Sequence, residues 1–61
     1  MKKYKIDYLL KLVHQEFERI NKDGYDLRAE ILASTMHELQ ENPGMDVVQA
    51  FTNAMVEWDV Y

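Results

Sequence analysis

Two histidines are the residues best placed to do chemistry, because each has a glutamate one helical turn further along. His14 precedes Glu18 by four residues, and His37 precedes Glu41 by four. Either pair could share a cation, but a zinc site needs three or four ligands in matched geometry. His37-Glu38 begins like a metalloprotease zinc helix, yet the second histidine of that motif is absent. We therefore predict no metal site, and expect both histidines to be ion-paired or solvated.

Catalytic nucleophiles and phosphate-binding loops are equally poorly represented. Ser34 and Thr35 have no glycine-rich elbow, and no histidine is placed beside them by the sequence. Gly24 and Gly44 are the only glycines, too few for a phosphate-cradling loop. A chain of 61 residues also has little capacity to enclose a substrate pocket of about 300 Å³. We predict no catalytic residue, no cofactor and no enzymatic activity.

Cationic side chains are confined to the first 28 residues. That segment has seven lysines and arginines against five carboxylates, a net charge of about +2. Residues 29–61 have six carboxylates and no lysine or arginine, a net charge of about −6. Affinity for nucleic acids comes largely from cationic side chains that bind phosphates. Specific nucleic-acid binding is therefore not expected.

The length predicts one small helical domain spanning residues 1–61. A core of this size is marginal, and the absence of cysteine excludes disulfides, so dimerisation is a candidate source of stability. The basic start does not continue as a signal peptide, because Asp7 and Lys11 interrupt the apolar stretch. No membrane span is expected, and we predict a cytoplasmic protein encoded as a complete small reading frame that starts at Met1.

Two clusters of turn residues divide the chain, at 21–24 and 42–44. The segments between them have helical periodicity and no period-two alternation. The sequence therefore predicts an all-α, compact three-helix domain with helices at about 3–21, 26–41 and 46–60.

Each predicted helix has an apolar face that we expect to be buried. The first face comprises Ile6, Leu9, Leu10, Val13, Phe17 and Ile20. The second, predicted to be the most widely buried, comprises Ala29, Ile31, Leu32, Thr35, Met36 and Leu39. The third comprises Val47, Val48, Phe51, Ala54, Met55 and Trp58. Asp26 and Asp46 are the predicted N-caps of the second and third helices. Gln49 follows Asp46 by three residues, and the two together resemble a capping box.

A second apolar row on the first helix is the leading candidate for a contact surface. Tyr4, Tyr8 and Leu12 are spaced by four residues on the side away from the predicted core, with Lys11 and Arg19 as charged neighbours. Aromatic residues with a nearby arginine often dominate protein interfaces. Alternatively, the tyrosines tolerate water and lysine stems cover them.

A weaker candidate surface lies near the end of the third predicted helix. Val56 and Val60 are four residues apart among polar neighbours, and they would either bind a partner or pack on the first helix.

These patterns favour a small, non-enzymatic protein–protein interaction module, a regulator or inhibitor that self-associates as a dimer. The alternative is an acidic mimic of nucleic acid, possible for a phage or mobile element, that blocks a basic groove. Its acidic face would comprise Glu30, Glu38, Glu41, Glu57 and Asp59. A helix-turn-helix DNA-binding regulator is less favoured, because the helix that would read bases has no cation beside Gln49, Thr52 and Asn53.

Overall fold

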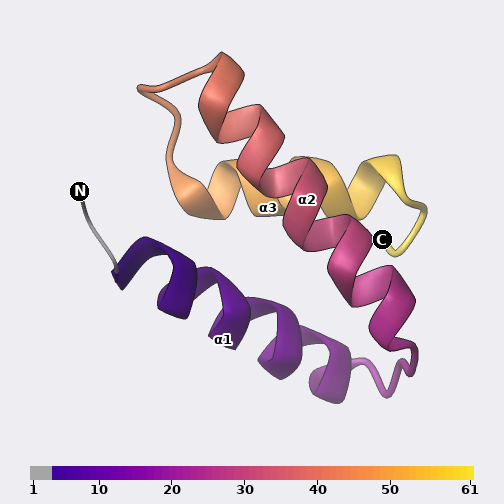
Figure 1. Cartoon of the computed structure of the whole chain (residues 1–61). Coiled ribbons are helices and arrows are strands. Elements are labelled where there is room, and N and C mark those ends of the chain that lie inside the picture. Colours follow the sequence, from indigo (N-terminus) through magenta and orange to yellow (C-terminus); the bar gives the residue numbers. More distant parts are fainter. Residues whose placement is uncertain (1–3) are drawn as a thin grey trace.

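The computed structural model describes the backbone of residues 4–61 and the side chains from residue 6 onward. It contains α1 (Tyr4–Arg19), α2 (Tyr25–Glu41) and α3 (Val47–Glu57), with no strand in the described range. The predicted all-α, three-helix fold is confirmed. α2 packs more extensively on α3 than α1 packs on either, and α1 diverges from α2 toward its amino end (Figure 1).

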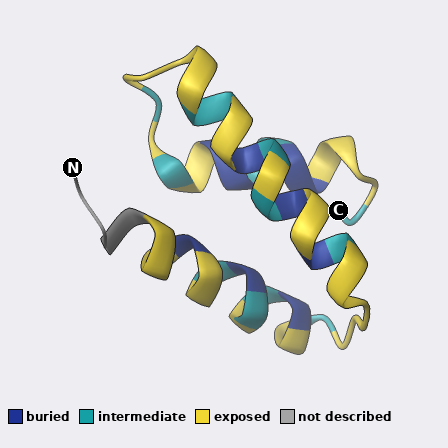
Figure 2. Cartoon of the chain, in the orientation of Figure 1, coloured by how far each residue is buried: buried dark blue, intermediate teal, exposed yellow. Residues whose placement is uncertain are grey.

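The core lies where the three helices face one another (Figure 2). It is a continuous cluster of seven buried side chains: Leu9, Val13, Phe17, Ile31, Phe51, Ala54 and Met55. Four half-buried apolar residues pack against the cluster: Leu27, Leu32, Val47 and Val60. All three helices contribute to it, so each is held mainly by removal of apolar surface from water.

The buried row of α1 is narrower than the predicted face. Leu9, Val13 and Phe17 are spaced by four residues and are buried, whereas Ile6 and Leu10 are 46% and 42% exposed. Ile6 lies on the same side of the helix as the buried row, but it precedes Leu9 in the part of α1 that diverges from α2. Leu10 is rotated by about 100° from Leu9 and so lies at the edge of the row. The prediction that both are core residues is wrong.

α2 buries only part of the predicted face, together with Arg28, which was not predicted to be buried. Its buried residues are Arg28, Ile31 and Thr35, while Ala29 and Met36 are exposed. The Thr35 hydroxyl donates to the Ile31 carbonyl at 2.7 Å, which satisfies a polar group inside the core. Three buried residues in 17 compare with four in the 11 of α3, so α2 is not the most widely buried helix.

The N-caps follow the predictions in α3 but not in α2. Asp46 accepts a hydrogen bond from the Val48 amide at 3.0 Å, as predicted. α2 instead begins after Gly24, whose φ of 117° suits glycine and whose missing side chain leaves no cap hydrogen bond. Asp26 lies in the first turn of α2, where its negative charge interacts favourably with the helix dipole, but it does not cap the helix. Gln49 does not complete a capping box, because its amide donates to Asn53.

α1 and α3 end in the same way, at a residue with left-handed backbone conformation. Asn21 has φ of 54°, and the Lys22 amide donates to the Phe17 carbonyl at 2.8 Å. Asp59 has φ of 58°, and the Val60 amide donates to the Met55 carbonyl at 2.8 Å. Both arrangements are Schellman motifs. α3 therefore ends at Glu57 and not near residue 60 as predicted, because the turn at Asp59 reverses the chain.

Candidate functional site

The first half of α1 exposes more apolar surface than the sequence predicted. Tyr8 is 45% exposed and Leu12 is half-buried, while the side chain of Tyr4 lies outside the described residues. Leu10 is exposed at the other edge of the buried row, and Ile6 is exposed on the side of the row itself, before Leu9. We call these described residues, together with the exposed Lys11, the α1 surface: Ile6, Tyr8, Leu10, Lys11 and Leu12.

The second flank was missed because periodicity assigns a residue to a side of a helix, not to a position along its neighbours. Ile6 has the correct angular position for the core but is exposed, and it lies near the amino end of α1. The sequence indicated this exposed surface only through the excess of apolar residues near the amino end of α1.

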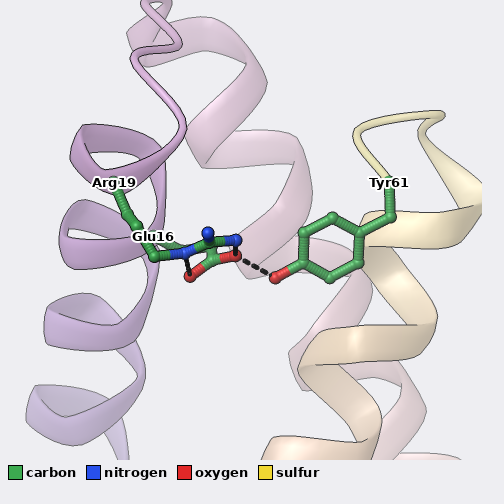
Figure 3. Close-up of polar contacts among 3 residues, drawn as sticks. All are labelled: Glu16, Arg19 and Tyr61. Carbon is green, nitrogen blue, oxygen red and sulfur yellow. Dashed lines mark hydrogen bonds and ion pairs between the residues drawn. The ribbon is translucent and has the colours of Figure 1, made fainter.

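Arg19, predicted as a charged neighbour of this surface, is bound within the chain. Its Nε donates to Glu16 Oε1 at 2.9 Å and its Nη2 to Oε2 at 2.5 Å. The Tyr61 hydroxyl donates to the same carboxylate, so three side chains join the end of the chain to α1 (Figure 3). A carboxylate that already accepts three hydrogen bonds leaves Arg19 less free to bind a partner.

The contacts among Glu16, Arg19 and Tyr61 shift the pKa of each of the three side chains. The hydrogen bond from Arg19, followed by that from Tyr61, lowers the pKa of Glu16 from 4.5 to about 2. The same carboxylate raises the pKa of Arg19 above its ordinary value. Loss of solvent around the hydroxyl, followed by its bond to Glu16, raises the pKa of Tyr61 above 10.0. These directions favour the ionised pair with a neutral tyrosine.

The two valines proposed as a second surface are separated by the turn at Asp59. Val60 packs against the core, whereas Val56 is exposed on α3. They do not form the shared helical face that a helix continuing to residue 60 would give them.

The carboxylates of the predicted acidic face have different surroundings. Glu30, Glu41, Glu57 and Asp59 are exposed. Glu38 is half-buried and accepts a hydrogen bond from the Asn42 side chain at 3.3 Å. The face is therefore divided between α2 and the end of α3.

The residues considered as base readers on α3 bond to their own helix. Gln49 Nε2 donates to Asn53 Oδ1 at 2.9 Å, and Thr52 Oγ1 donates to the Val48 carbonyl at 2.9 Å. Gln49 and Asn53 would give up their mutual bond on contacting a base.

A polar cluster that the sequence did not predict joins α1 to the first turn of α2. Arg28 is only 9% exposed, and its Nη1 lies 2.6 Å from His14 Nδ1. The guanidinium carbon lies 5.1 Å from the ring centre of Phe17 and 4.6 Å from that of Tyr25. Such stacking is a favourable cation–π arrangement. His14 thus has an arginine partner and does not pair with Glu18.

Arg28 was missed because charged residues are seldom buried, so a lone arginine between apolar residues is ordinarily assigned to solvent. Its spacing carried a signal, since Arg28 precedes Ile31 by three residues and Thr35 by seven, which places all three on one face.

No group of three or more histidines and carboxylates within the described part of the chain could hold a metal ion. Within residues 4–61, no helix combines the length and apolarity needed to cross a membrane. Comparisons with protein-family models, curated proteins and solved structures found no match for this chain.

Proposed function

We propose that this chain is a small, non-enzymatic protein–protein interaction module that regulates or inhibits its partner in the cytoplasm and associates with itself. The observation that carries the proposal is the α1 surface. Large apolar side chains at positions 6, 8 and 10 are each more than 40% exposed within two helical turns. Scattered exposed apolar residues are ordinary, but several together with a charged neighbour are typical of an interface.

The loose placement of α1 also supports this proposal. Its amino end diverges from α2, so a partner can reach both flanks of the buried row. A small domain that leaves apolar surface exposed gains stability when a second protein covers it.

Sedimentation equilibrium at high micromolar concentration tests self-association. We expect an apparent mass well above 7.3 kDa for the native chain. Tyr8→Lys and Leu10→Lys, made separately, test the two flanks of the α1 surface. Val56→Lys is the matched control, because it adds the same charge at an exposed apolar position on α3. A lower mass for an α1 variant but not for the control supports the proposal, provided that circular dichroism shows unchanged helicity.

A monomeric native chain would remove self-association and leave the foreign partner to be tested. Affinity capture from the source cells, followed by mass spectrometry, should then identify a protein retained by Val56→Lys and lost with an α1 variant. Retention of every captured protein by both α1 variants would contradict the proposed surface.

Mimicry of nucleic acid is a second candidate, supported by four exposed carboxylates within residues 29–61, which contain no lysine or arginine: Glu30, Glu41, Glu57 and Asp59. Such a protein would bind the basic groove of an enzyme that handles DNA or RNA. Its affinity for the captured partner should then collapse between about 50 and 200 mM salt, because exposed charges are screened. Salt-insensitive binding would favour the apolar α1 surface instead.

A further inference from the structure

Arg28 is a buried cation without a carboxylate partner among the described residues. It is 9% exposed, and the one ion pair in the described part of the chain joins Arg19 to Glu16. Buried charges in proteins are ordinarily paired with an opposite charge. Here the nearest acceptor is His14, which offers a neutral nitrogen and no negative charge.

The contacts of the guanidinium leave one of its edges unused. The Phe17 and Tyr25 rings pack against the guanidinium, and Nη1 is directed to His14. Nε is buried and has no hydrogen-bond partner in the structure. An unsatisfied buried donor is unfavourable, and a guanidinium edge presents two parallel N–H groups that match the two oxygens of a carboxylate.

We propose that the Nε edge of Arg28 is a binding site for a carboxylate. The two oxygens would accept hydrogen bonds from Nε–H and from the adjacent amino group, while Nη1 keeps its bond to His14. This site is independent of the α1 surface and extends the function proposed above, because it recognises an anion and not an apolar face.

The charge of the site favours a carboxylate over a phosphate. Arg28 supplies one positive charge, which a monoanion neutralises. Asp23 and Asp26 are exposed within five residues of it along the chain and would oppose a second negative charge. The burial of Arg28 among the Phe17 and Tyr25 rings lowers the local dielectric, which strengthens a charge-assisted hydrogen bond to the guanidinium.

Tyr25 is the more exposed of the two aromatic residues that contact the guanidinium. Its ring covers the guanidinium, yet the residue is 74% exposed. Within the described residues its hydroxyl has no hydrogen bond that would hold the ring in place. A side chain this exposed can change rotamer without separating the helices.

Nuclear magnetic resonance of the arginine Nε–H groups tests the proposal on the native protein. Sodium acetate is titrated against sodium chloride at constant ionic strength and pH 7. The chain has two arginines, and Arg19 is an internal control because its Nε already donates to Glu16. We expect a saturable shift of the Arg28 signal with little change at Arg19. No shift at Arg28, or parallel unsaturated shifts of both signals, would overturn the site.

A second series of experiments identifies the class of anion and tests whether the two parallel N–H groups of the guanidinium are needed to bind it. Inorganic phosphate replaces acetate in one arm, and a saturable response to phosphate alone would overturn the assignment to carboxylate. Thermal unfolding with and without acetate is compared for the native chain, Arg28→Lys and Arg19→Lys. Arg28→Lys keeps the charge but lacks the two parallel N–H groups, so its acetate-dependent rise in Tm should be lost. Arg19→Lys should keep the native response, and an equal loss in both variants would overturn the proposal.

Discussion

His14 and Arg28 depend on one another because a guanidinium can only donate hydrogen bonds. Arginine stays charged in proteins, so Nη1 donates and His14 Nδ1 accepts. The His14 proton must then reside on Nε2, and protonation of Nδ1 would place two donors and two cations in contact. The neighbours facing this imidazole are Arg28 and Tyr25 on α2, with Phe17 completing the cluster.

Two substitutions of His14 should distinguish the contribution of its hydrogen bond to stability from that of its packing. His14→Leu leaves the Arg28 Nη1 donor unsatisfied and should lower the free energy of unfolding by about 1–3 kcal/mol. His14→Gln keeps a side-chain acceptor and should lower it by less. Urea denaturation of the two variants and the native chain measures the difference. Equal losses for both variants would show that the hydrogen bond is not what His14 contributes.

The identity of the buried residues of α2 was only partly predictable. Ile31 is buried as expected, because apolar periodicity reports where a side chain prefers to be. Arg28 and Thr35 are buried through specific polar partners, His14 and the Ile31 carbonyl. Spacing places both Thr35 and Arg28 on the face of Ile31, but the burial of Arg28 also depends on a partner 14 residues away in the sequence, which spacing does not reveal.

At the level of whole helices, the two Schellman turns decide where α1 and α3 stop. Asn21 and Asp59 adopt left-handed φ, which asparagine and aspartate tolerate better than most residues do. The number of helices was predictable from the breakers and the periodicity. The end of α3 was not, because aspartate is a much weaker stop signal than glycine.

Replacement of Asp59 should show how strongly α3 depends on its turn. Asp59→Val places a β-branched residue at φ of 58° and should destabilise the fold by about 1–2 kcal/mol. Asp59→Gly removes the steric penalty and should be neutral or stabilising. Thermal unfolding followed by circular dichroism compares them. A valine variant as stable as the native chain would mean that the turn at Asp59 is not retained in solution.

Substitution at the N-cap of either α2 or α3 should destabilise the fold, for a different reason in each helix. Asp46→Ala removes the bond to the Val48 amide and should cost about 1 kcal/mol. Gly24→Ser introduces a good capping residue, yet it should also destabilise because Gly24 has φ of 117°. Urea midpoints of both variants test this expectation, and stabilisation by Gly24→Ser would contradict the backbone conformation at the start of α2.

Across the whole molecule, the contact of Tyr61 with Glu16 closes the chain by joining its last residue to α1. Val60 packs on the core beside this contact, so the segment after Asp59 is held by one apolar and one polar interaction. The sequence did not predict this arrangement, because it follows from the reversal of the chain at Asp59 and not from any local pattern.

Acid should weaken this closure. The pKa of Glu16 is lowered from 4.5 to about 2 by Arg19 and Tyr61, so ionised Glu16 stabilises the fold above pH 4.5. That contribution is lost as the pH falls from about 4.5 to 2, and it is modest because Arg19 is largely exposed. Urea midpoints at pH 6 and pH 3 should therefore differ less for Glu16→Gln than for the native chain. Glu18→Gln, at a nearby exposed glutamate, should retain the native difference.

Trp58 Nε1 donates a hydrogen bond of 2.8 Å to Ser34 Oγ, which places the fluorescent indole at the contact between α3 and α2. Trp58 is the single tryptophan, so its fluorescence reports one place, the junction of α3 with the middle of α2. α1 packs less extensively, so denaturant should lower total helicity by circular dichroism before the tryptophan emission shifts to the red. Coincident transitions would instead mean that all three helices melt as one cooperative unit. The chain thus contains a native fluorescent label that distinguishes release of α1 from global unfolding.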